Sequence, residues 1–530
     1  MAPQIDHVIV LVLENRSFDQ LLGFHPSADP DFDGLLHGGP YTNPGYDGGP
    51  PVPAEPTGKH VLPVDPDHAH DAVMAQLGLV GGGAARTPTN SGFVQSYERK
   101  GRGLAAPAFE GLLGPLANLL HLGQSTGTTA PVSGRGPLIM RCLAPDNVPV
   151  LTELAAGFGV CSRWFASVPG ETWPNRNFLH AATSDGTTDN EPRFYYNRTI
   201  FEVLEQAGRS WHIYYDDTPQ VWAFSRLWDD GRAANWFRSQ EFASHVRSGR
   251  LPNYSFIEPN HRPPIHATPF VHVDGVHGHS NSQHPANNQV PNADYDAAPA
   301  SGPGDFERGE SLIAEVYEAL RANPEVFSRS VLLVTWDEHG GFYDHVLPPT
   351  NVPAPGGRPR PGLLGRLIRL LLRRKTTAFD FTMLGVRVPA LVISPLVPAG
   401  SVDSTVRDHA SVPATLRALF APDQPPLTER DRWAPPFLQL LSRQDPRRSD
   451  LPDLSGWVAR EPAAPSVTLP APGQPEPPVP GYYRDLVQLA DEVDRELPGP
   501  TAPPALGPRA KARHVTSEFQ SHAESSRATG

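Results

Sequence analysis

HVIVLVL at residues 7–13 and VLLVT at residues 331–335 are the two apolar runs that decide the fold of this chain. Continuous β-branched runs of this kind are typical of strands buried on both faces, as in a parallel sheet covered by helices. Both runs lead into polar clusters, ENRSFD at 14–19 and WDEHGG at 336–341. In such sheets ligands bind at the carboxyl ends of the strands, so both clusters lie where a site is expected.

Four polar side chains in these clusters point to a cation site. If the two strands are neighbours, Glu14 and Asn15 converge with Asp337 and Glu338. Carboxylates packed together without compensation would repel one another and raise one another's pKa. The clusters therefore predict a bound hard cation.

The rest of the chain alternates helix and strand, which is the pattern of βαβ units. The sequence predicts helices at 199–208 and 310–320 and strands at 211–215 and 386–394. We therefore expect an α/β fold, a three-layer sandwich with a mostly parallel central sheet. Long Gly/Pro-rich loops interrupt it, such as 27–67 and 259–303, and loops of this length are commonly functional.

Composition divides the chain into three parts and limits its partners. We expect a catalytic domain at 1–445, a Pro-rich extension with one helix at 446–509, and a disordered tail at 510–530. A net charge of −13 argues against a nucleic-acid binder, which would need a basic face. The two cysteines, Cys142 and Cys161, read best as buried apolar residues, with one disulfide as the alternative. The start shows no secretory signal, which predicts a cytoplasmic protein, or an exported one if the N-terminus is incomplete.

A third motif, VPGETWPNRN at 168–177, is a rigid turn followed by a helix expected from Asn177 onward. The Thr172 hydroxyl at this turn suits attack on a phosphoester if a metal ion activates it. Backbone N–H groups and Arg176 would stabilise the charge that develops on phosphorus. Taken alone, the motif fits an ordinary turn in which Thr172 caps a helix better than it fits a nucleophile.

Together the three motifs, in this order, resemble the bacterial phosphoesterase family of non-specific phospholipases C and the acid phosphatase A group, in the alkaline-phosphatase-like superfamily. The resemblance runs from about residue 7 to 420 and includes GVRVP at 385–389 and DHAS at 408–411. It implies an alkaline-phosphatase-like fold. This chain departs from the family in having Glu171 before the nucleophile, where a proline is common, and in lacking an export signal.

The resemblance also implies roles for individual residues. Thr172 matches the nucleophile, which also touches the metal ion. His284 and His68 match histidines of the phosphate pocket, with His70 close enough to be confused with His68. The metal ligands would be Glu14, Asn15, Asp337, Glu338 and Thr172.

This ligand set holds one divalent ion, and its oxygen atoms favour Ca²⁺, Mg²⁺ or Mn²⁺, with Zn²⁺ as an alternative. The ion would lower the pKa of the Thr172 hydroxyl and neutralise a phosphoryl oxygen. Thr172 would attack in line, His284 would protonate the departing alcohol, and water would hydrolyse the phosphothreonine.

The remaining histidines are weighed separately. Five in one Gly/Pro-rich loop match no zinc pattern, so they are expected to be solvated: His261, His266, His272, His277 and His279. His339 is expected to pack behind a ligand, and His409 to be structural or to pack behind a ligand. For His345 that reading and a substrate-side role are equally open.

A basic amphipathic segment bears on the substrate. Leucines and arginines at 362–374 fall on opposite sides of a predicted helix, which would lie either on an anionic membrane or on the protein itself. The sequence leaves three functions open. The favoured one is a phospholipase C-type phosphodiesterase, because a helix that lies on a membrane would suit a phospholipid substrate. The alternatives are a phosphomonoesterase on the same site and a non-catalytic, metal-stabilised binding protein. The sequence leaves the oligomeric state open.

Overall fold

The structure is a computed structural model that describes residues 4–79, 87–102, 133–190, 195–217, 219–228, 232–261, 280–290, 295–298, 305–356 and 379–458. The predicted helix at 362–374, the tail at 510–530 and most of the 446–509 extension lie outside these residues. None of the helices in the described part is both long and apolar enough to cross a bilayer.

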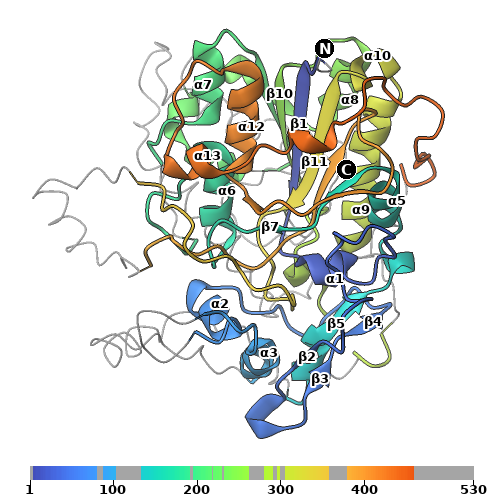
Figure 1. Ribbon diagram of the computed structural model, residues 1–530, viewed down its shortest axis with the longest axis vertical. Helices are drawn as coiled ribbons and strands as arrows, with labels where there is room; N and C mark the ends of the chain where they lie inside the picture. The colour runs from blue at the N-terminus through green and yellow to red at the C-terminus, as the bar shows by residue number, and fades with distance from the viewer. Residues whose placement is uncertain are drawn as a thin grey trace, which may run out of the picture.

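An eight-stranded sheet forms the centre of the molecule (Figure 1). Its spatial order is β13-β6-β12-β11-β1-β10-β8-β9. All neighbouring pairs are parallel except the two that β12 makes. The strand bounds are β1 His7–Leu13, β6 Gly159–Cys161, β8 Trp211–Tyr215, β9 Trp236–Arg238, β10 Tyr254–Glu258, β11 Ser330–Trp336, β12 Ala390–Ile393 and β13 Ser401–Asp403.

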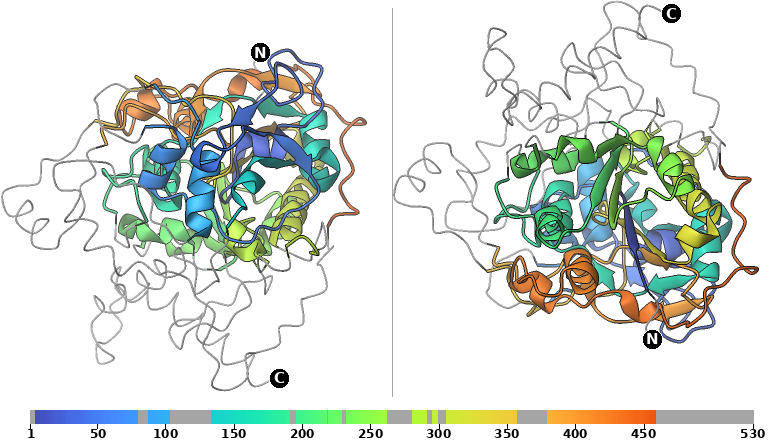
Figure 2. Two further views of the ribbon diagram at one scale, coloured as in Figure 1. Left: turned by 90° about the horizontal axis from the view of Figure 1, so that it is seen from below. Right: turned by 90° about the horizontal axis from the view of Figure 1, so that it is seen from above.

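Helices cover both faces of this sheet, so the predicted three-layer α/β sandwich is confirmed (Figures 1 and 2). One layer holds α6 Thr172–Ala181, α7 Ile200–Gln206, α12 Ser411–Phe420 and α13 Glu429–Trp433. The other holds α5 Pro149–Gly157, α8 Glu241–Arg247, α9 Asp305–Arg321 and α10 Pro324–Phe327. Because helices cover both faces of the sheet, the side chains of β1 and β11 are buried on each face, and both strands are apolar at almost every position.

The predicted elements differ from the structure mainly at their ends. The helix predicted at 199–208 is α7, where Thr199 and Glu202 form a capping box. The strand at 211–215 is confirmed, and the helix at 310–320 is longer at both ends. The strand predicted at 386–394 is shorter, because only β12 joins the sheet, and it runs antiparallel to its neighbours.

A smaller layer lies beyond the carboxyl ends of the parallel strands, at the bottom of Figure 1. It contains α1 Phe18–Leu22, α2 His70–Gln76, α3 Phe93–Gly101 and the short strands β2 Thr42–Asn43, β3 Val52–Pro53, β4 Glu55–Thr57 and β5 Arg141–Leu143. Its apolar side chains form a core of their own, around residues such as Val73, Phe93 and Met140. This layer covers the sheet edge where both polar clusters emerge.

The described chain continues past the predicted domain boundary at residue 445. Leu454 is buried in the main core, its backbone N–H donates to Glu318, and the Tyr317 hydroxyl donates to the carbonyl of Pro452 at 2.8 Å. Residues 452–454 therefore pack on the central α/β core, beyond the predicted boundary.

Candidate active site

The two polar clusters meet, because β1 and β11 are direct neighbours in register. Leu13 pairs with Trp336, so the residues that follow leave the sheet side by side. The backbone N–H of Asn15 donates to Asp337 Oδ1 at 3.0 Å, and that of Arg16 donates to the Glu338 carbonyl at 2.9 Å. The predicted convergence is confirmed.

Positive φ angles allow the two loops to pass this closely. Asn15 has φ 60°, and Gly340 and Gly341 have φ 63° and 76°. A Cβ on Gly340 would lie 2.2 Å from the Asn15 carbonyl oxygen, and one on Gly341 would lie 2.8 Å from that of Asp67. Only glycine fits both the backbone conformation and the space at these two positions.

Thr172 is brought to the same place by α6. This helix begins at Thr172, five residues earlier than predicted, because Pro174 is tolerated in the first turn. The Asn175 side chain holds the preceding turn: it accepts the N–H of Val168 at 2.9 Å and donates to the Glu171 carbonyl at 3.0 Å. The fully buried Thr172 Oγ1 lies 3.5 Å from Asn15 Oδ1.

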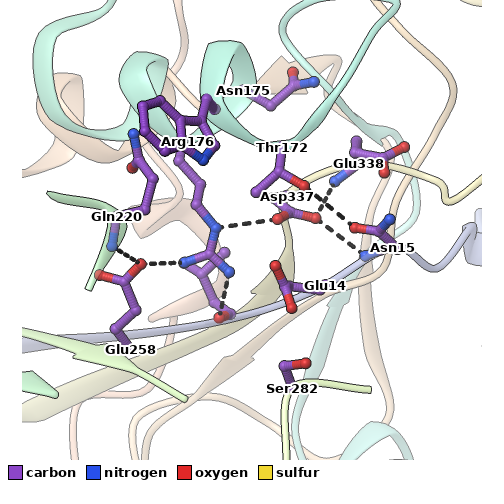
Figure 3. A network of polar contacts seen from close by, with 12 residues as sticks. Glu14, Asn15, Thr172, Asn175, Arg176, Gln220, Glu258, Ser282, Asp337 and Glu338 are labelled. Atoms are coloured by element: carbon purple, nitrogen blue, oxygen red, sulfur yellow. Dashed lines mark hydrogen bonds and ion pairs between the residues drawn. The ribbon is translucent and has the colours of Figure 1, made fainter. Parts of the chain in front are cut away.

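Arg176 lies one helical turn further along and binds protein groups (Figure 3). Its Nε donates to Asp337 Oδ2 at 3.0 Å and its Nη1 to Glu258 Oε1 at 3.0 Å. Its Nη2 donates to the Val12 carbonyl at 3.3 Å. In the structure the guanidinium therefore orients Asp337, and its predicted role of stabilising charge on phosphorus stays a prediction.

The two predicted pocket histidines lie on the other side of Asn15. Asn15 Nδ2 is 3.0 Å from His284 Nε2 and 3.4 Å from His68 Nδ1. His284 Nδ1 accepts the backbone N–H of Ala286 at 3.1 Å, and its Nε2 faces the Asn15 side chain. Burial lowers the pKa of His284 well below its usual value, so this ring is neutral.

The acidic side chains show the electrostatic need for a cation. Both carboxylate oxygens of Glu14 and Oε1 of Glu338 are buried with no hydrogen-bond partner in the described part of the chain. Burial raises the pKa of each of these two carboxyls to about 8. Oxygen atoms that lose water and gain no donor are what a bound metal ion compensates. The residues present therefore fit the predicted ion, with Asp337, Asn15 and Thr172 beside them.

Among the described residues, two groups of acids and histidines have ligand atoms that all lie within 4.8 Å of one another, and neither includes Glu14, Asp337 or Glu338. In the first, Asp65 joins His68 and His284. In the second, Asp19 and Asp344 surround His345.

The second group is already compensated by Arg387. Its Nη2 donates to Asp19 at 2.8 Å and its Nε to Asp344 at 3.1 Å. His345 binds Asp19 and Asp33, which favours the packing role over the substrate-side one.

Sequence reasoning placed one histidine wrongly. His261 was expected to be solvated, but it is fully buried, and its Nδ1 lies 2.9 Å from Asp217 Oδ1. Burial by itself would lower the pKa of His261, but Glu14 and Asp217 outweigh burial and raise it to about 9. The sequence feature that could have placed His261 near the site is its position three residues after Glu258, the last residue of β10. The other four loop histidines lie outside the described residues.

The comparisons with known proteins agree with this geometry. The model of the Phosphoesterase family matches residues 5–421. Non-specific phospholipase C3 of Arabidopsis thaliana is 31% identical over 465 residues, which cover 84% of this chain and 75% of that protein. Phospholipase C B of Mycobacterium tuberculosis is 28% identical over 373 residues, which cover 62% of this chain and 63% of that protein.

Solved structures resemble this chain only distantly. A protein in the alkaline phosphatase superfamily from Vibrio parahaemolyticus has a TM-score of 0.28 at 10% identity, over 52% of this chain and 60% of that one. A likeness of this size supports no argument about the site.

Proposed function

Because this chain belongs to the Phosphoesterase family and is a phosphoric ester hydrolase, we propose that it cleaves phosphodiesters in the manner of a phospholipase C, with Thr172 as its nucleophile. The observation that carries the proposal is the meeting of Thr172 with two clusters more than three hundred residues apart in sequence. The curated relatives named phospholipase C point to a phospholipid as the substrate.

A divalent ion would be held by Glu14, Asn15, Asp337, Glu338 and Thr172. When bound, it would lower the pKa of the Thr172 hydroxyl and offset charge on a phosphoryl oxygen. The oxygen donors keep Ca²⁺, Mg²⁺ and Mn²⁺ as the first candidates, with Zn²⁺ as the alternative.

The chain's own groups account for the covalent steps. Thr172 Oγ1 forms a bond to phosphorus and gives up its proton, and the bond from phosphorus to the alcohol oxygen breaks. The departing oxygen takes up a proton, and water then releases the headgroup phosphate from Thr172. The N-terminus of α6 supplies backbone N–H groups near the developing charge.

His284 and His68 are assigned different roles in the reaction. A neutral imidazole N–H is a poor acid, so His284 suits hydrogen bonding to a phosphoryl oxygen better than the proton transfer expected of it. His68 is partly exposed and its Nδ1 lies 3.9 Å from Glu338 Oε1. We assign it the protonation of the leaving alcohol.

The charges around Thr172 favour a diester over a monoester. A monoester brings an extra anionic oxygen and needs additional positive charge. Arg176 binds Asp337 and Glu258, and Arg16 donates to the Gln283 carbonyl at 2.9 and 2.7 Å. Both arginines bind protein groups, and Glu171 adds negative charge beside the nucleophile.

The test compares Thr172→Ala with Thr172→Ser in parallel assays on a phosphocholine diester and an aryl phosphate. Thr172→Ala should abolish turnover, and the serine variant should retain part of it. Mass spectrometry of wild-type enzyme quenched during turnover of the phosphocholine diester should find a phosphocholine group on the peptide that contains Thr172. Unchanged turnover in the alanine variant would refute the mechanism, and faster cleavage of the aryl phosphate would favour the monoesterase.

A further inference from the structure

The buried dyad of Asp217 and His261 lies against one side of the proposed metal site. His261 Nε2 is 4.0 Å from Glu14 Oε1 and 3.9 Å from Glu258 Oε1. All of these side chains are buried to 99% or more. A histidine so placed is part of the carboxylate cluster and is shielded from solvent.

Asp217 decides which nitrogen of the ring faces Glu14. It accepts the Nδ1 hydrogen of His261 across 2.9 Å, so the ring presents Nε2 to the cluster. A histidine that binds a metal ion commonly donates its other ring N–H to a carboxylate in this way, which fixes the ring orientation. The dyad has the arrangement of a metal ligand with its supporting acid.

The distance between His261 and Glu14 suits a shared ion better than a hydrogen bond. Hydrogen bonds between nitrogen and oxygen end near 3.2 Å. Two donors that each lie about 2.1 Å from one ion are about 3 to 4 Å apart, depending on the angle between them. Glu14 also offers two buried carboxylate oxygens that have no hydrogen-bond partner among the described residues.

Glu258 is a weaker candidate to share this ion. Its Oε1 already accepts from Arg176 at 3.0 Å and from the backbone N–H of Gln220 at 2.8 Å. We propose that His261 is a further ligand of the metal ion, bound through Nε2 next to Glu14 and oriented by Asp217. This inference rests on the proposed function, because it adds a residue to the same metal site.

A nitrogen ligand changes which ions the site prefers. Imidazole suits Fe²⁺ and Zn²⁺ better than Ca²⁺ or Mg²⁺, which take oxygen donors. The oxygen-dominated set expected from the sequence left Ca²⁺ and Mg²⁺ among the first choices. With His261 included, Mn²⁺ or a later transition metal binds more tightly than Ca²⁺.

The experiment loads the full-length, metal-depleted protein with Mn²⁺ and records its affinity and its pulsed EPR spectrum. Wild-type protein should show ¹⁴N modulation from a coordinated imidazole. In His261→Gln this modulation should disappear, the Kd for Mn²⁺ should rise about tenfold or more, and the preference for Mn²⁺ over Ca²⁺ should fall. Asp217→Asn should weaken Mn²⁺ binding about 10- to 100-fold.

The matched control is His212→Gln. His212 is near the start of β8, at the opposite end of that strand from the polar clusters, and it should leave both readouts unchanged. Wild-type protein with bound Mn²⁺ but no ¹⁴N modulation would overturn the inference, whether or not the variants fold. So would His261→Gln protein with unaltered modulation and affinity. If wild-type protein binds no divalent ion, the proposed metal-dependent function itself fails.

Discussion

Replacing Arg176 with methionine tests whether this residue positions Asp337 or contacts the substrate. Methionine keeps much of the volume and removes the charge. Two fully buried carboxylates, Asp337 and Glu258, would each lose an arginine partner at 3.0 Å. The Val12 carbonyl would lose a donor as well.

The size of the effect follows from the cost of an unpaired buried charge. Breaking a buried ion pair by removing one partner costs about 3 to 5 kcal/mol. Because two carboxylates share one arginine, we expect the upper end, about 5 kcal/mol at pH 8 without metal. For a chain of 530 residues this corresponds to a Tm lower by about 5 °C.

The loss of stability in the Arg176→Met variant should depend on pH. An orphaned carboxyl has a raised pKa in the folded chain, so the folded variant binds protons that the unfolded chain releases. The variant therefore recovers stability as the pH falls, by about 1.4 kcal/mol for each pH unit and each carboxyl that becomes protonated. The gap to wild type should be widest near pH 8 and narrow towards pH 5.

The assay is thermal unfolding followed by circular dichroism, from pH 5 to pH 8 with chelator present. Adding Glu258→Gln to the Arg176→Met protein should restore about 1 kcal/mol or more, because one orphaned charge is removed. Arg432→Met is the control: Arg432 pairs with Glu429 but is 62% exposed, so its loss should cost under about 1 kcal/mol. A Tm for Arg176→Met within a degree of wild type, or no rescue by Glu258→Gln, would refute the positioning role.

Three further predictions follow from the same region. Metal-free protein should lose stability as the pH rises from about 5 to about 8, because Glu14 and Glu338, with folded pKa values of about 8 against 4.5 unfolded, hold protons in this range only when folded. Chemical unfolding at several pH values checks this, and a flat profile without metal would contradict it. Gly341→Ala should lower kcat/KM as well as stability, because its Cβ would meet Asp67 and Pro66 beside His68. Gly356→Ala is the control: its φ of 69° is similar and no neighbour lies nearer than 3.4 Å, so it should lower stability alone, by about 1–2 kcal/mol. Equal kinetics in the two variants would argue against this role for the 65–68 loop. Glu310→Gln should change stability by less than about 1 kcal/mol, because burial raises the pKa of Glu310 to about 8 and the neutral side chain still accepts from the backbone N–H groups of Val150 and Leu151. Glu310→Ala removes this acceptor and should cost about 1–3 kcal/mol in the same assay.

The sequence alone determined what depends on neighbours along the chain. The runs at 7–13 and 331–335 are apolar at consecutive positions, which is enough to predict strands covered on both faces. The polar residues that end each run and the turn before Thr172 are local patterns too. Their convergence could be anticipated because parallel strands end at the same sheet edge.

What only the tertiary structure decided are contacts between residues remote in sequence. The direct pairing of β1 with β11 and the reversed direction of β12 depend on how strands order themselves across the sheet, which local pattern does not encode. The partners of Arg176 are two buried carboxylates that lie 82 and 161 residues further along the chain, which no local pattern could indicate. His261 was misplaced for the same reason: its burial depends on Asp217 and Glu14, which lie on other loops.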